Sequence, residues 1–171
     1  MNDSSNTIYV PSGINFEILR ELKEDKRGRI KEYKDLVKEE VQVLNSKDIW
    51  SIKCDVAFPC ATQFELDEND ANKLINNGVI GVFEGANMPC TIEAANLFIK
   101  NKVIYSPGKA SNAGGVAVSG LEIEQNKNNE KWSFEKVDNR LKEIMSNIFN
   151  NIYKTACDLN DPYNLVKGAN N

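Results

Sequence analysis

The stretch Val79-Ile80-Gly81-Val82-Phe83-Glu84-Gly85-Ala86-Asn87 joins a short apolar run to a turn of small and amide residues. Apolar runs at residues 55–58 and 103–105 have the same form, and each is followed by Pro, Gly or Asn. Amphipathic patterns predict helices over residues 15–25, 67–76 and 91–101. Alternating strands and helices predict an α/β fold with a parallel sheet and right-handed crossovers.

The second half of the chain has no strand pattern. A helix is predicted over residues 116–126, entered through Gly114-Gly115, and a turn is predicted at residues 161–164. From Ser133 onward, apolar residues recur every three or four positions, which predicts one helix of about five or six turns. The stripe consists of Phe134, Val137, Leu141, Ile144, Met145, Ile148, Phe149 and Ile152. We expect it to pack on the sheet or on a neighbouring domain.

Composition excludes several kinds of protein. The chain has 171 residues, 41% of them hydrophobic, with no apolar run near the roughly 20 residues that span a bilayer. A net charge of -4 argues against nucleic acid as a main partner, because phosphate binding needs a basic face. The sequence has no histidine and four scattered cysteines, which makes a zinc site, a histidine-based triad or a disulfide scaffold improbable. We expect a soluble, intracellular protein without a metal.

Three strand ends carry small residues and carboxamides: residues 59–63, 84–89 and 106–116. Ligands bind at the carboxyl ends of strands in open parallel sheets. Small side chains let a flat ring approach the backbone, and amides can pair with a ligand amide or ribose without adding charge. For one loop, a simple turn is the better interpretation. For three consecutive strand ends, a nicotinamide riboside site is favoured.

Two weaker signals surround these loops. The glycine pair Gly114-Gly115 before a helix could bind an anion, with Ser119 one turn later, although glycine also marks tight packing. Lys23, Lys26 and Arg29 form a basic row at three-residue spacing, and the first two share a face if the helix persists. On composition alone, a solvated surface balanced by nearby acidic residues is an equal alternative.

Taken in order, residues 59–63, 84–89, 107–116 and 119–122 closely resemble the NADP-type glutamate dehydrogenases, and the resemblance runs from about Asp3 to Asn170. Each motif is moderately specific, whereas the ordered set is highly specific. The resemblance implies an incomplete Rossmann-like parallel sheet flanked by helices, followed by a long-helix C-terminal segment. Residues 1–115 would be the C-terminal part of the NADP-binding domain, and residues 116–171 would link and pack against the cofactor and substrate domains.

The resemblance also implies a function and a set of site residues. The parent enzyme would be a cytoplasmic homohexamer that interconverts L-glutamate with 2-oxoglutarate and ammonia, using NADP. Asn112 would contact the nicotinamide carboxamide, Val116 the substrate side chain and Ser119 its distal carboxylate. The nicotinamide and its ribose would lie against Ala61, Thr62, Gln63, Ala86 and Asn87. The adenosine ribose and 2′-phosphate would lie beside Asp3, Ser4, Lys23, Lys26 and Arg29. Serine with lysine suits a doubly charged phosphate.

The sequence departs from the family in several places. The Gly-rich diphosphate turn and the catalytic lysine and aspartate have no counterpart here, so no residue of this chain is assigned a catalytic role. We therefore expect a piece of a longer enzyme that is inactive alone. Lys109 lies in a Pro-Gly-Lys-Ala loop and is assigned a structural role. Phe64 stands where the family usually has asparagine.

Two other functions stay open. One is a non-catalytic, regulatory module of the same fold that binds a nucleotide or an amino acid. The other is a helical interaction protein whose long apolar stripe docks a partner. In a module that had lost catalysis, the site residues would be expected to drift, yet those that would touch cofactor and substrate keep suitable chemistry. An interaction protein would not need Asn87, Asn112 and Ser119 at strand ends and a glycine-rich helix start. Both points favour the enzyme.

Overall fold

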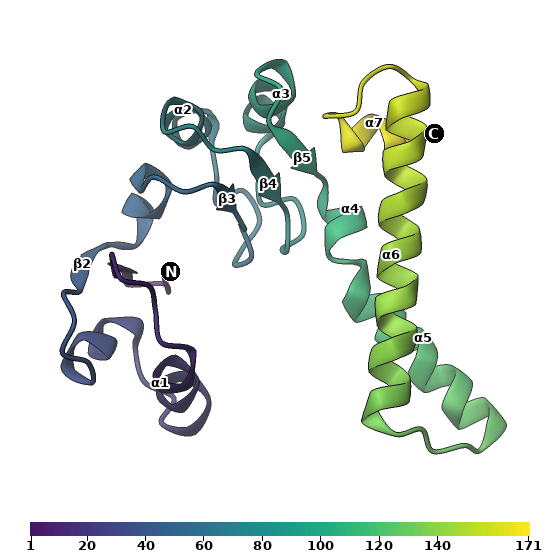
Figure 1. Cartoon of the computed structure of the whole chain (residues 1–171), viewed down its shortest axis with the longest axis horizontal. Coiled ribbons are helices and arrows are strands. Elements are labelled where there is room, and N and C mark those ends of the chain that lie inside the picture. The colour runs from purple at the N-terminus through teal and green to yellow at the C-terminus, as the bar shows by residue number, and fades with distance from the viewer. The chain divides into compact units, whose positions relative to one another are not determined.

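The computed structural model describes all residues from Met1 to Asn171 (Figure 1). The chain divides into two compact units, unit 1 (Met1–Lys53) and unit 2 (Cys54–Asn171). None of the helices combines the length and the apolar composition needed to cross a bilayer.

Unit 1 is built on a two-stranded antiparallel sheet in which Asn6 faces Asn45 and Tyr9 faces Gln42. Its side chains close a small core around Ile8, Leu22 and Tyr33, each at most 1% exposed. The elements of this unit are β1 (Asn6–Tyr9), α1 (Phe16–Arg20), the π-helical turn η1 (Glu21–Asp25), the 3-10 turns η2 (Ile30–Asp35) and η3 (Ser46–Ser51), and β2 (Gln42–Asn45).

Unit 2 contains a parallel three-stranded sheet made of β3 (Val56–Ala57), β4 (Gly81–Phe83) and β5 (Ile104–Ser106), in that spatial order (Figure 1). The connections between the strands are α2 (Glu68–Asn76) and α3 (Ile92–Lys100), which pack against each other. Asp67 and Thr91 cap these helices by accepting hydrogen bonds from backbone N–H groups of the first turn, as their residue types favour.

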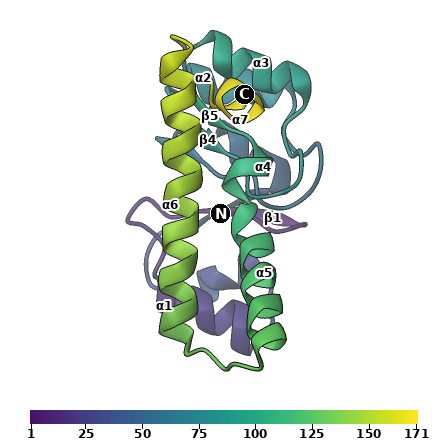
Figure 2. The same ribbon diagram turned by 90° about the vertical axis from the view of Figure 1, so that its right-hand side faces the viewer.

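Four helices follow the sheet: α4 (Gly108–Ser111), α5 (Ala113–Asn128), α6 (Phe134–Asp158) and α7 (Leu165–Asn170). Figures 1 and 2 show α5 and α6 running antiparallel, side by side. Gly114 of α5 lies against α6, where an added Cβ would be in ordinary contact, 3.8 Å from Leu141 and from Met145. At its other end α6 packs on α7, burying Ala156 and Leu165.

The predicted α/β class, the parallel sheet and the long helix are confirmed. Three details differ. The glycine pair lies inside the first turn of α5, not before the helix, because α5 begins at Ala113. Helix α6 extends to Asp158 and is 25 residues long, more than the six turns expected. The antiparallel pairing of β1 with β2 and the helix α7 were not predicted. The domain boundary predicted after Gly115 stays a prediction about a longer chain.

Candidate functional site

The carboxyl ends of β3, β4 and β5 open onto a groove of about 570 Å³ in unit 2. The three strand-end loops singled out in the sequence all contribute to it. The residues that line the groove are Cys60, Ala61, Thr62, Gln63, Gly85, Ala86, Asn87, Asn112, Gly115 and Val116. The structure therefore brings every predicted nicotinamide residue to one surface.

The loop after β3 is tied to the loop after β4 by backbone bonds. The N–H groups of Gly85 and Ala86 donate to the carbonyl of Pro59 at 2.9 and 3.1 Å. A side chain at Gly85 would place its Cβ only 2.4 Å from the sulfur of Cys60. A larger residue at this position would therefore force the Cys60 side chain to move, and glycine avoids that contact.

Asn112, between α4 and α5, ties the loop after β5 to the loop after β4. Its side-chain amide donates to the carbonyl oxygen of Ala86 at 3.2 Å and to the side-chain oxygen of Asn87 at 3.0 Å. Two carboxamides are thus oriented against each other at the groove. Carboxamides offer both donors and acceptors, which are the groups that a nicotinamide carboxamide can pair with.

The groove is uncharged, since none of its lining residues is acidic or basic. An uncharged surface of small and amide residues suits a flat, neutral ring and its ribose, and gives no means of compensating a phosphate charge. The uncharged lining of the groove therefore suits the nicotinamide and its ribose, which were assigned to these residues from the sequence.

Val116 and Ser119 lie on α5 at different positions relative to the groove. Val116 lines it and is 79% exposed, so its side chain can contact a ligand. Ser119 is exposed one turn later, and its hydroxyl donates to the carbonyl of Gly115 at 3.3 Å. Ser119 is not among the lining residues, and its role toward a substrate stays a prediction.

In unit 1, the carboxylate of Asp3 accepts hydrogen bonds from the backbone N–H groups of Ser5, Asn6 and Ile30 at 2.9, 3.0 and 3.0 Å. Partial burial acts to raise the pKa of Asp3, but these three donors and the charge of Lys23 outweigh it, so the pKa lies below its usual value. Asp3 thereby holds the chain that precedes β1 against the start of η2.

The predicted basic row is divided between two arrangements. Arg29 donates from its guanidinium to the hydroxyl of Ser4 at 3.1 Å, and Lys23 donates to the carbonyl of Gly28 at 2.8 Å. Lys26 instead forms an ion pair with Glu21 at 2.8 Å. Since η1 ends at Asp25, Lys26 lies beyond the helix rather than on a continuous face with Lys23.

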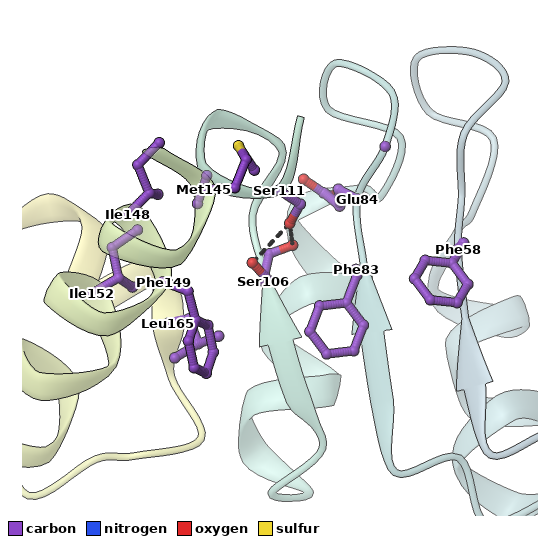
Figure 3. Close-up of a pocket in the computed structure, with 12 residues that line it drawn as sticks. Phe58, Phe83, Glu84, Ser106, Ser111, Met145, Ile148, Phe149, Ile152 and Leu165 are labelled. Atoms are coloured by element: carbon purple, nitrogen blue, oxygen red, sulfur yellow. Dashed lines mark hydrogen bonds between the residues drawn. The ribbon is translucent and has the colours of Figure 1, made fainter. Parts of the chain in front are cut away.

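A second cavity in unit 2, of about 290 Å³, contains none of the predicted site residues (Figure 3). Phe58 and Phe83 of the sheet face Met145 and Phe149 of α6 across it, and the hydroxyl of Ser111 donates to that of Ser106 at 2.7 Å. Its lining is mostly apolar, with few groups that could orient a polar ligand. The uncharged groove at the strand ends, with its carboxamides, is therefore the better candidate for a polar ligand such as a nicotinamide riboside.

Glu84 is a further functional candidate that was not predicted from the sequence, in which it stood out only as part of a motif. Glu84 is 4% exposed, lies directly after β4 and lines the apolar cavity. The signal was an ionisable residue at the end of a fully apolar run, a position where charged side chains are uncommon.

Comparison with known proteins shows the family to which the chain belongs. The profile of the Glutamate/Leucine/Phenylalanine/Valine dehydrogenase family matches residues 1–171. An NADP-specific glutamate dehydrogenase of Helicobacter pylori is 47% identical over 176 residues, and an NAD(P)-specific glutamate dehydrogenase of Xylanibacter ruminicola is 48% identical over 172 residues. Each alignment covers 99% of this chain, but only 39% and 38% of the respective relatives.

Among solved structures, that of Plasmodium falciparum glutamate dehydrogenase matches with a TM-score of 0.91 and 46% sequence identity. The match covers 99% of this chain and 37% of that structure. The chain therefore spans less than half the length of the proteins that it resembles.

Proposed function

This chain belongs to the Glutamate/Leucine/Phenylalanine/Valine dehydrogenase family, and we propose that it is the cofactor-side part of an NADP-dependent glutamate dehydrogenase. The parent enzyme interconverts L-glutamate with 2-oxoglutarate and ammonia. The observation that carries the proposal is the uncharged groove in which Asn112 meets Ala86 and Asn87 at the strand ends. No residue of this chain is assigned the acid-base chemistry.

When bound, NADP supplies the ring that accepts or donates a hydride. The residues of the groove hold and orient that ring. Asn112 and Asn87 present amide groups for its carboxamide, while the small residues Ala61 and Ala86 allow its flat face close to the backbone. Orientation of this kind lowers the entropic part of the barrier to transfer. Thr62 and Gln63 are assigned to the ribose.

The substrate is assigned to α5. Val116 is exposed beside the groove and can pack against the methylene groups of glutamate. Ser119, one turn later, is assigned to donate a hydrogen bond to the distal carboxylate. That bond would replace its present bond to the carbonyl of Gly115 at 3.3 Å.

Unit 1 is assigned the 2′-phosphate of the cofactor. Ser4 and Arg29 are already in hydrogen-bond contact, Asp3 fixes the segment that carries Ser4, and Lys23 adds a positive charge nearby. Charge-assisted bonds from such groups favour a phosphate over a free ribose hydroxyl. Lys26 is assigned a lesser share because Glu21 already pairs with it. The family resemblance also supports a cytoplasmic homohexamer.

The test is Lys23→Ala in the full-length enzyme, with Michaelis constants measured for NADP and for NAD. A charge-assisted hydrogen bond to phosphate contributes about 1.5–3 kcal/mol, so the preference for NADP should fall by roughly tenfold or more. Lys26→Ala should have a smaller effect. Lys34→Ala, at an exposed lysine of η2, serves as the charge-matched control and should have none. Equal weakening of both cofactors by Lys23→Ala would show that Lys23 does not read the phosphate.

A further inference from the structure

The carboxylate of Glu84 is a buried acceptor for three donors. One oxygen accepts from the hydroxyl of Tyr105 at 2.5 Å and from the backbone N–H of Cys90 at 3.2 Å, and the other accepts from the backbone N–H of Gly108 at 2.7 Å. At 4% exposure, Glu84 has little access to water. A buried carboxylate persists in a folded protein when donors such as these compensate its charge.

The three donors come from three different segments. Tyr105 lies in β5, Gly108 begins α4, and Cys90 precedes α3. Burial, together with the neighbouring Glu84, raises the pKa of both Tyr105 and the Cys90 thiol. The tyrosine therefore keeps its proton and remains a donor. Glu84 thus joins the end of β4 to the segments that follow it in the chain.

A short path leads from Glu84 to the amide of Asn112. Gly108, bound to Glu84, accepts from the backbone N–H of Asn112 at 2.9 Å across the single turn of α4. The side chain of Asn112 then returns to the carbonyl of Ala86, two residues after Glu84, at 3.2 Å. A Cβ at Gly108 would lie 2.8 Å from that carbonyl and 3.3 Å from the Asn112 amide nitrogen. These contacts form a closed ring from Glu84 through Gly108 and Asn112 to Ala86, and a larger residue at Gly108 would disturb it.

We propose that Glu84 is a positioning residue, whose buried carboxylate fixes the first turn of α4 and thereby the amide of Asn112 that orients the nicotinamide. The inference rests on the proposed function, because it assigns the groove to the nicotinamide end of the cofactor. A carboxylate is required since both oxygens accept. A carboxamide would face at least one of these N–H or O–H donors with its own NH2 group.

The experiment compares two ligands of the full-length enzyme, NADPH and adenosine 2′,5′-bisphosphate, which lacks the nicotinamide riboside. Binding of each is measured by calorimetry for the wild type and for Glu84→Gln. We expect the affinity for NADPH to fall about tenfold, the scale of one lost charge-assisted bond, while the affinity for the bisphosphate stays unchanged. A general structural defect would weaken both ligands, and that result would overturn the proposal, as would two unchanged affinities.

Two further variants make the result specific. Tyr105→Phe removes one bond to Glu84 and keeps the bond to Gly108, so it should lower the melting temperature and leave both affinities unchanged. Gly108→Ala disturbs the same contacts at the first turn of α4 and should also lower the affinity for NADPH selectively. This variant provides the test if Glu84→Gln does not fold. If Gly108→Ala weakens both ligands alike, the proposal fails.

Measurements on the wild-type enzyme distinguish a failure of the positioning role of Glu84 from a failure of the proposed function. Wild-type enzyme that binds NADPH and oxidises glutamate supports the proposed function whatever Glu84→Gln does. Wild-type enzyme that binds neither ligand overturns the proposed function, and the positioning role of Glu84 with it.

Discussion

Phe64 occupies a backbone conformation that its side chain does not favour. Its φ is +55°, its side chain is 60% exposed, and its N–H donates to the carbonyl of Met88 at 3.0 Å. Large L-residues are disfavoured in this left-handed region, whereas asparagine tolerates it. Asparagine, which the family resemblance implies at this position, would suit this backbone conformation better than phenylalanine.

Phe64→Asn should therefore stabilise the protein by about 1 kcal/mol, because it relieves this backbone cost at the loss of little buried area. Urea unfolding, followed by circular dichroism, measures the change. Phe64→Leu is the matched control, since it also shortens the exposed apolar side chain but keeps the unfavourable backbone preference. If leucine stabilises as much as asparagine, the gain arises from the surface and not from the backbone.

At the scale of single elements, the sequence predicted helix starts and strands where neighbouring residues alone determine them. Asn15, Asp67, Thr91 and Ser133 accept hydrogen bonds at the N-termini of α1, α2, α3 and α6, where their residue types and the adjoining apolar periodicity indicated helix starts. Three apolar runs became β3, β4 and β5. The groove was predictable because the carboxyl ends of parallel strands meet at one edge.

The missed elements depend on distant partners. Strand β1 pairs with β2, which lies more than thirty residues later in the chain, and neither has a marked alternation of apolar residues. Helix α7 has six residues, too few for a periodic pattern, and is held by tertiary contacts. Lys109 makes one of these tertiary contacts, because its amine donates a hydrogen bond to the carbonyl of Ala169 in α7 at 3.1 Å. The pairing of Lys26 with Glu21 likewise depends on where η1 ends.

Helix α7 packs on α6 through a glycine. A Cβ on Gly168 would lie 2.3 Å from the carbonyl oxygen of Ile152, so α7 would have to move away from α6. We expect Gly168→Ala to destabilise the protein by about 1–3 kcal/mol, the scale of overpacking a close contact. Urea unfolding of the variant against the wild type measures this loss.

Gly120→Ala is the control for that substitution. Gly120 lies within α5 and has nothing within 4 Å of an added Cβ, so alanine there should stabilise the helix by about 0.5–1 kcal/mol. Equal effects of the two substitutions would contradict the assigned contact between α7 and α6.

At the scale of the whole molecule, the candidate residues fall in both compact units. The residues assigned to the 2′-phosphate belong to unit 1, and those assigned to the nicotinamide and the substrate belong to unit 2. Residue types and the family resemblance predicted both sets from the sequence. The contacts that order them, such as Asn112 with Ala86 and Arg29 with Ser4, required the structure.

The family includes dehydrogenases for four amino acids, so the choice of substrate is the central claim. The direct test is reduction of NADP by the full-length protein with glutamate, leucine, phenylalanine or valine, beside the 171-residue chain alone. We predict turnover of glutamate by the full-length protein only, and none by the isolated chain, in which no residue is assigned the acid-base chemistry. Preference for an apolar amino acid, or turnover by the isolated chain after removal of host enzyme, would contradict the account.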